Sequence, residues 1–86
     1  MKIPDSEALI VRHIGEPLLG GVNHYEHAIV KYRGKYYLVV RHCRPAYNAI
    51  GMPDWPWSCE DYWYAYEGPF KTLEEAESRA RELGDL

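Results

Sequence analysis

The run HYEHAIVKYRGKYYLVVRHC, residues 24–43, constrains the fold more than any other part of the sequence. Two segments rich in tyrosine, valine and isoleucine lie on either side of Arg33-Gly34, a pattern typical of two strands joined by a tight turn. Gly34 is suited to the positive φ angle that a two-residue hairpin turn requires. The sequence therefore predicts an antiparallel β-hairpin over residues 24–43.

The register of this hairpin follows from the turn. Counting outward from a two-residue turn places Tyr32 opposite Lys35, and it places Glu26 opposite Arg41 in a favourable pair of opposite charges. A slip of one residue would exchange the two faces. Both faces are largely apolar, so we expect a central hairpin that is covered on each side. The predicted faces are Ala28, Val30, Tyr32, Tyr37 and Val39 on one side, and His27, Ile29, Tyr36, Leu38 and Val40 on the other.

The second strong signal is the C-terminal run KTLEEAESRAREL, which predicts a helix over residues 72–83. Thr72 is a suitable N-cap residue, and Glu75 three positions later completes a capping box. Gly84 is suited to the left-handed conformation that ends many helices. Because the helix has one narrow apolar stripe, we expect it to pack on a sheet. The stripe consists of Leu73, Ala76, Ala80 and Leu83.

The segment DYWYAYE alternates in the manner of a short strand. Its three tyrosines would point to one face of the sheet, and Trp63 would point to the other. Trp63 is therefore expected in the core. Phe70, which precedes the helix, is expected to be buried beside the start of the helix.

Two further segments complete the predicted fold. Residues 8–14 fit a short helix as well as a strand, and their β-branched content favours the strand. Residues 44–60 hold three prolines and one glycine and are expected to form a long loop. Together these elements predict an α+β fold as a single domain over residues 1–86. An antiparallel sheet of three or four strands would contain the central hairpin (24–43), with the C-terminal helix (72–83) packed on it.

Size and composition bound the class of protein. A chain of 86 residues, 47% hydrophobic and 27% charged, is expected to form one core. No apolar run approaches the roughly 18 residues that cross a bilayer, and the start MKIPDSEALIV lacks the pattern of a signal peptide. We therefore expect a cytoplasmic protein without a membrane partner. In that compartment Cys43 and Cys59 are expected to be reduced thiols.

The net charge of −3 is unevenly distributed along the chain. Residues 1–45 carry seven basic and four acidic side chains, whereas residues 46–86 carry three basic and nine acidic ones. An acidic protein binds nucleic acid poorly, because contacts to phosphate supply most of that affinity. A protein partner with a basic or nucleic-acid-binding surface is therefore favoured over nucleic acid itself.

The sequence contains no catalytic or cofactor motif, so we predict that the protein is not an enzyme and has no cofactor. One weak metal pattern exists. His24 would face Cys43 across the hairpin and form half a zinc site with it, to which Cys59 or His13 would contribute further ligands. The alternative is that these are incidental residues at strand ends, because no CxxC pair is present. We predict no metal site.

The stretch GMPDWPWSCEDYWYAYEGPF, residues 51–70, is the candidate binding surface. It holds all three tryptophans of the chain, and two of them alternate with prolines that restrict the segment. Rigid aromatic side chains dominate many protein interfaces. The alternative is that this segment folds over the sheet as a lid of the core. The predicted partner-binding residues are Asp54, Trp55, Trp57, Glu60, Asp61, Tyr62, Tyr64 and Tyr66.

A second function class uses the basic hairpin. Basic and aromatic side chains that alternate on a sheet are typical of domains that stack the bases of single-stranded nucleic acid. The alternative to a binding role is a solvated hairpin tip whose charges prevent edge pairing. The residues of this alternative site are Lys31, Arg33, Lys35, Tyr36 and Arg41.

The tail GPFKTLEEAESRAREL resembles an ending found in small bacterial and phage-encoded domains, in which a Gly-Pro-Phe turn leads into a Glu-Glu-Ala helix. The whole chain is similar in kind to small phage-borne inhibitors such as anti-CRISPR proteins, which are short, acidic, aromatic-rich and without catalytic motifs. This resemblance implies that the protein blocks a host nucleic-acid-binding or defence complex. A second copy of the chain is an alternative cover for the apolar hairpin, so a homodimer stays open.

Overall fold

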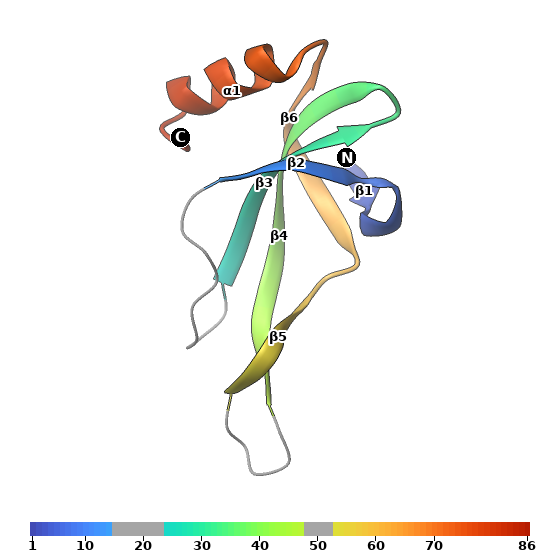
Figure 1. The fold of residues 1–86 in the computed structure, drawn as a ribbon, viewed down its shortest axis with the longest axis vertical. Helices are drawn as coiled ribbons and strands as arrows, with labels where there is room; N and C mark the ends of the chain where they lie inside the picture. The colour runs from blue at the N-terminus through green and yellow to red at the C-terminus, as the bar shows by residue number, and fades with distance from the viewer. Residues whose placement is uncertain (15–23, 48–52) are drawn as a thin grey trace.

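An antiparallel sheet with one helix packed on it makes up the computed structural model (Figure 1). The structure describes residues 1–14, 24–47 and 53–86, and describes side chains in 1–14, 25–43 and 59–86. The α+β class is therefore confirmed. The elements in chain order are β1 (Lys2–Pro4), the 3-10 turn η1 (Asp5–Glu7), β2 (Leu9–Ile14), β3 (His24–Tyr32), β4 (Lys35–Tyr47), β5 (Pro53–Cys59), β6 (Tyr62–Phe70) and α1 (Leu73–Glu82).

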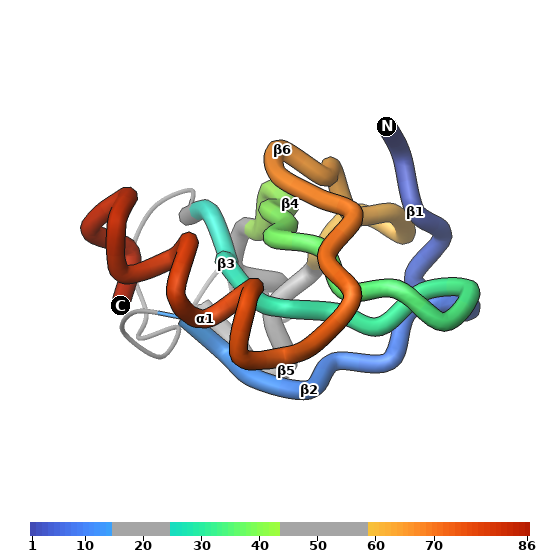
Figure 2. The backbone as a smooth tube through the Cα atoms, turned by 90° about the horizontal axis from the view of Figure 1, so that it is seen from above, coloured from blue at the N-terminus to red at the C-terminus, as the bar shows by residue number. Residues whose placement is uncertain are grey.

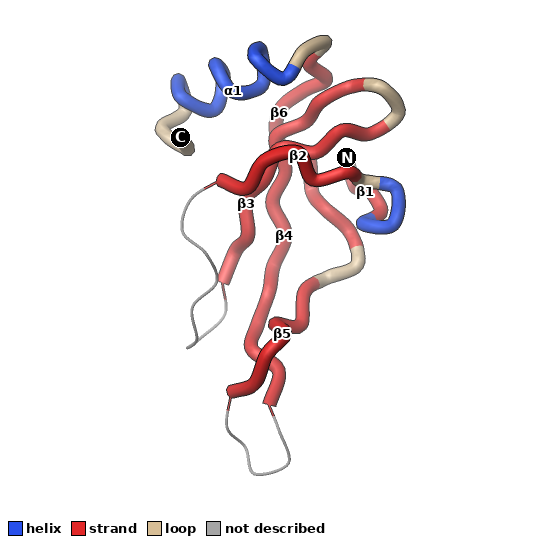
Figure 3. The backbone as a smooth tube through the Cα atoms, in the orientation of Figure 1, coloured by secondary structure: helices blue, strands red, loops and turns tan. Residues whose placement is uncertain are grey.

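The sheet is larger than the three or four strands expected. Five strands follow the order β1-β6-β4-β3-β2, and β5 pairs with the far end of β4 (Figure 3). Strand β4 is 13 residues long, and its second edge is shared by β6 and then by β5. The prediction of a long loop over residues 44–60 is therefore wrong, because both ends of that segment are strands despite their prolines.

The N-terminal segment joins the two edges of the sheet. Strand β1 pairs with β6 at one edge, β2 pairs with β3 at the other, and only η1 separates them. The sheet must therefore curl until its edges approach, and Figure 2 shows the N-terminal segment running from β6 round to β3. The backbone N–H of Asp5 donates to the carbonyl of Asp61 at 2.9 Å and so fastens η1 to β6. Curling in this way leaves fewer strand edges open.

The predicted hairpin register is confirmed. Tyr32 pairs with Lys35, and Glu26 pairs with Arg41, in the ladder of β3 and β4. The two turn residues have φ angles of 51° and 80°, the positive values of the hairpin turn favoured by the twist of the strands. Residues 9–14 form strand β2, so the strand interpretation of the ambiguous N-terminal segment is also confirmed.

Two apolar clusters lie on opposite faces of the sheet, as the hairpin pattern predicts. The inner face, turned toward the N-terminal segment, buries Trp63 completely, as expected. The outer face is the one on which α1 packs. The inner cluster consists of Ile3, Ala28, Val30, Val39 and Trp63. The outer cluster consists of Ile14, Ile29, Leu38, Ala76 and Ala80, with the half-buried Phe70 packed against it.

Strand β2 contributes to both clusters because its pairing with β3 shifts between Ile10 and Arg12. Such a bulge changes the face to which the following residues point. Ile10 packs on the inner cluster, whereas Ile14 belongs to the outer one. Because of the bulge, one edge strand contributes apolar side chains to the clusters on both faces of the sheet.

Helix α1 begins and ends as predicted. Thr72 caps it by accepting a hydrogen bond from the backbone N–H of Glu75 at 3.2 Å, while the carboxylate of Glu75 accepts from the backbone N–H of Lys71. Ala76 and Ala80 are fully buried, and their small size allows the helix to approach the sheet closely. Gly84 has a φ angle of 79°. No helix in the described part of the chain is both long enough and apolar enough to cross a membrane.

Two glycines with positive φ angles provide a matched test of the fold. A Cβ atom at Gly68 would lie 2.8 Å from Tyr37 Cδ1, whereas a Cβ atom at Gly34 would meet nothing within 4 Å. We expect Gly34→Ala to lower the free energy of unfolding by about 1–2 kcal/mol through the backbone alone. Gly68→Ala should cost a further ~1–3 kcal/mol because the methyl group is also overpacked. Urea denaturation followed by tryptophan fluorescence measures both, and equal losses would contradict the close packing at Gly68.

Candidate functional site

A groove of about 460 Å³ lies on the outer face of the sheet. Tyr25 and Tyr64 are the most exposed of its aromatic residues, at 63% and 52%. We call it the tyrosine groove. It is lined by Lys2, Tyr25, Val40, Arg41, His42, Glu60, Tyr62 and Tyr64.

Strand alternation brings the aromatic residues of the groove together. Trp63 is buried on the inner face, so Tyr62 and Tyr64 on either side of it point to the outer face. On the neighbouring strands, Tyr25 and His42 are direct partners in the register of β3 and β4. Four aromatic side chains from three strands therefore meet on one surface.

The side chains of the groove contact one another in an ordered way. The Lys2 ammonium lies 4.6 Å from the ring centroid of Tyr62, and the rings of Tyr25 and His42 are 5.3 Å apart. A hydrogen bond with Glu60 raises the pKa of the Tyr62 hydroxyl. The backbone N–H of Glu60 donates to the carbonyl of His42 at 3.2 Å, which holds the bend between β5 and β6 against β4.

The third tyrosine of β6, Tyr66, lies outside the groove. Its hydroxyl donates to Asp85 Oδ2 at 2.9 Å, just beyond the end of α1. Burial, followed by the hydrogen bond to Asp85, raises the pKa of this hydroxyl. Tyr66 therefore fastens the C-terminal segment to the sheet and packs against the outer cluster.

The structure brings together part of the predicted partner-binding set. Glu60, Tyr62 and Tyr64 line the groove, whereas Asp61 is exposed at the bend beside it. The other predicted residues, Asp54, Trp55 and Trp57, belong to β5, and their side chains lie outside the part that the structure describes.

Two groove residues that the sequence analysis did not name are Tyr25 and His42. The predicted register already placed them opposite each other, on the same face as Val40. The predicted pairing of Tyr25 with His42 could therefore have identified both residues as part of this surface.

The residues of the basic alternative do not all lie together. Lys31, Arg33 and Lys35 are exposed near the hairpin turn, where Lys31 Nζ lies 5.7 Å from the ring centroid of Tyr36. Tyr36 itself is half-buried against the outer cluster. Arg41 is not part of this patch, because its guanidinium is held among acidic side chains on the inner face.

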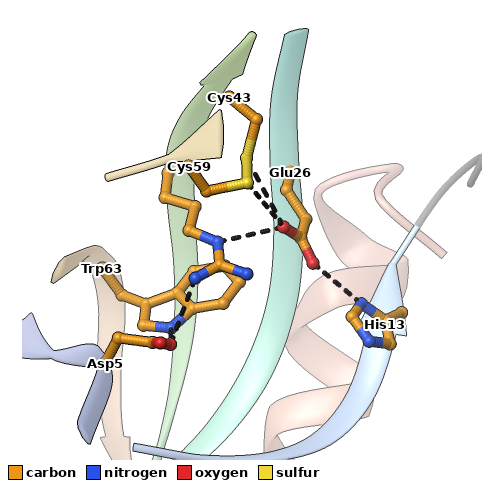
Figure 4. Close-up of a disulfide and its surroundings, with 7 residues drawn as sticks. Asp5, His13, Glu26, Cys43, Cys59 and Trp63 are labelled. Atoms are coloured by element: carbon orange, nitrogen blue, oxygen red, sulfur yellow. Dashed lines mark hydrogen bonds and ion pairs between the residues drawn. A yellow bond between two sulfur atoms is a disulfide. The ribbon is translucent and has the colours of Figure 1, made fainter. Parts of the chain in front are cut away.

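An ion-pair network around Arg41 supports the inner face (Figure 4). Arg41 Nε lies 3.0 Å from Glu26 Oε2, and Arg41 Nη1 lies 3.1 Å from Asp5 Oδ1. The guanidinium covers the ring of Trp63 at 4.1 Å, and the indole N–H of Trp63 donates to Asp5 Oδ1 at 2.8 Å. His13 Nδ1 lies 3.2 Å from Glu26 Oε1. One guanidinium therefore links η1, β3, β4 and β6, and a histidine from β2 joins them.

Next to this network, Cys43 and Cys59 form a disulfide. They are direct partners in the register of β4 and β5, with their Cα atoms 4.1 Å apart. The expectation of reduced thiols is therefore wrong for this structure, because the pairing of β5 with β4 was not foreseen. Glu26 Oε2 lies 3.6 Å from Cys43 Sγ and 3.9 Å from Cys59 Sγ. His24 stands opposite Cys43 in the register, as predicted.

Removal of the central guanidinium should destabilise the domain. Arg41 and Glu26 have side chains only 14% and 13% exposed, so Arg41→Leu would take the guanidinium away from a largely buried carboxylate. We expect a loss of about 2–4 kcal/mol in the free energy of unfolding. Arg81→Leu, on the exposed face of α1, is the control and should cost less than about 1 kcal/mol. Urea denaturation at neutral pH compares the two, and equal effects would show that the network contributes little.

Reduction of the disulfide should also lower stability. The two cysteines are 16 residues apart, and loop closure over that length contributes about 3 kcal/mol in the chain-entropy model. We expect this difference between urea denaturations with and without a phosphine reductant, both with a chelator present. A Cys43→Ser/Cys59→Ser variant should be insensitive to the reductant. Reactive thiols in native protein prepared without reductant would contradict the bond.

No family model matches the sequence, no curated protein matches it, and no solved structure matches it. These results do not bear on the resemblance to small phage-encoded inhibitors, which stays a prediction.

Proposed function

We propose that the protein is a non-catalytic binding domain that holds a basic segment of a partner protein in the tyrosine groove. The observation that carries this proposal is the pair of exposed tyrosines, Tyr25 and Tyr64, beside Glu60 in one groove of the outer face. Each property of the groove supports one part of the proposal.

The aromatic side chains support protein binding. Tyrosine presents a large, rigid contact area at a low cost in conformational entropy, and it is enriched at the energetic centres of interfaces. Tyr25 and Tyr64 are exposed by more than half, whereas Trp63, the residue before Tyr64 on β6, is completely buried. These two side chains are the ones whose apolar surface a partner would cover.

The acidic side chains at the groove favour a basic partner. Lys2 and Arg41 also line the groove, but the Arg41 guanidinium is already paired with Glu26 and Asp5. Glu60 lies in the groove and Asp61 lies beside it, within the half of the chain that carries nine acidic and three basic residues. The face of a tyrosine ring attracts a cation. Lys2 already uses the ring of Tyr62 in this way, which indicates how a lysine or arginine of a partner would bind to Tyr25 or Tyr64.

The local chemistry favours binding over catalysis. The ring of His42 packs against Tyr25, and the hydrogen bond from Tyr62 to Glu60 raises the pKa of the hydroxyl. A tyrosine that acts as a base or nucleophile needs the opposite shift. Tyr62 is therefore suited to contact a ligand and not to act as a base or nucleophile, which supports a binding role for this side chain.

The resemblance to phage-borne inhibitors suggests which basic surface is involved. Complexes that bind nucleic acid carry lysine and arginine side chains for phosphate contacts, and an acidic aromatic surface can occupy them. On this proposal the protein blocks such a host defence complex. Asp54, Trp55 and Trp57 on β5 are proposed to extend the contact surface.

Fluorescence anisotropy with defined probes tests the proposal. The probes are an extended peptide that alternates arginine with apolar residues, the same peptide with glutamate in place of arginine, and a single-stranded oligonucleotide. We expect binding of the arginine peptide alone. Tyr25→Ala/Tyr64→Ala should weaken it at least 30-fold, which corresponds to about 2 kcal/mol for an interface centre. Circular dichroism checks that this variant is folded.

The matched control is Lys31→Ala/Lys35→Ala near the hairpin turn, away from the groove. This variant should bind the arginine peptide as the native protein does. If instead only the oligonucleotide binds, with an affinity that falls steeply with salt and is lost in Lys31→Ala/Lys35→Ala, the nucleic-acid alternative is correct. Equal binding of both peptides would contradict recognition of basic residues.

A further inference from the structure

We propose that the protein, once its disulfide is reduced, binds a zinc ion through Cys43, Cys59 and Glu26. One oxygen of Glu26 and the two sulfur atoms all lie within 4.8 Å of one another. Among the side chains that the structure describes, this is the group of histidine, cysteine and acidic residues that is close enough to share a metal ion. The proposal goes beyond partner binding in the groove, because the site lies on the inner face.

Three neighbouring strands hold the ligands. Glu26 comes from β3, Cys43 from β4 and Cys59 from β5, and β3 and β5 flank β4 on either side. Figure 4 shows the two sulfur atoms turned toward the carboxylate of Glu26. Ligands on paired strands are already placed before the ion arrives, so little ordering is needed on binding.

The redox state decides whether the site exists. In the disulfide the two sulfur atoms are bonded to each other and cannot act as thiolate ligands. A dithiol reductant breaks the S–S bond with two electrons and two protons, giving two cysteine thiols, and becomes a cyclic disulfide itself. Zinc then replaces the two thiol protons, which are released. In the reverse step a small-molecule disulfide accepts two electrons and becomes two thiols, which restores the protein disulfide and frees the ion.

Charge balance supports zinc at this position. Two thiolates and the Glu26 carboxylate carry three negative charges, of which Zn²⁺ balances two, and the guanidinium of Arg41, shared with the more exposed Asp5, offsets the third. Arg41 Nε already lies 3.0 Å from Glu26 Oε2, within a half-buried ion pair. Charge neutrality matters at this largely buried position because an uncompensated charge that is removed from water raises the free energy of the folded state. Thiolate ligands also select zinc over magnesium or calcium.

The surroundings of the ligands resemble those of metal sites in general. Ligand carboxylates are usually oriented by further hydrogen bonds, and such outer partners affect metal affinity. Here Arg41 contacts one oxygen of Glu26, and His13 Nδ1 lies 3.2 Å from the other. Cys59 is only half-buried, which leaves room for water as the fourth ligand of a tetrahedral ion.

Cobalt is the probe for this site, because thiolate-bound tetrahedral Co²⁺ absorbs visible and near-ultraviolet light. Tag-free protein is reduced with a phosphine under argon, titrated with Co²⁺, and then titrated with Zn²⁺ to displace the cobalt. We expect one equivalent bound with a sulfur-to-cobalt charge-transfer band, and no band in the oxidised protein. Because both states are the same polypeptide, this comparison needs no variant.

Variants then assign the ligands. Glu26→Gln should weaken zinc binding more than about 100-fold, and His13→Ala about 10-fold, as for a residue that orients a ligand. Glu67→Gln, a carboxylate that pairs with Arg79 instead, is the control and should bind zinc like the native chain. Circular dichroism checks that each reduced variant is folded. Absence of the charge-transfer band in reduced protein, or equal affinity in Glu26→Gln and native protein, would overturn the proposal.

Discussion

The guanidinium of Arg41 is the centre of the ion-pair network on which the closure of the sheet depends. It is only 14% exposed, and it reaches two carboxylates, Glu26 and Asp5, while it covers the ring of Trp63. Asp5 in turn accepts the indole N–H, so the largest buried side chain has its polar atom satisfied. Because Asp5 belongs to the turn between β1 and β2, this network fixes the point at which the curled sheet closes.

The parts of the fold that depend on local periodicity could be predicted from the sequence. The hairpin register, its two faces and the cap of α1 follow from spacings of two to four residues. Strand β5 could not be predicted in this way, because its prolines conceal a segment whose pairing with β4 is set by tertiary structure. The disulfide was missed for the same reason: Cys59 meets Cys43 only once β5 lies beside β4.

The candidate site shows the same division. Tyr62 and Tyr64 were identifiable from strand alternation alone, whereas Tyr25 and His42 required the register to be carried one pair further. Tyr66 fits the alternation equally well, but the C-terminal segment binds its hydroxyl. Arg41 looked like one cation of a basic strand because a sequence does not show which carboxylates will surround a side chain.

Strand β4 places the two chemically distinct surfaces of the protein back to back. The guanidinium of Arg41 and the disulfide of Cys43 lie on the inner face, while His42 between them lines the groove, which Arg41 also borders. Across the strand pair, Cys59 carries the bond and the next residue, Glu60, enters the groove. A change in the distance between the backbones of β4 and β5 would therefore affect both the disulfide on the inner face and the groove on the outer face. A domain this thin has no intervening layer in which a displacement on one face could be absorbed before it reaches the other.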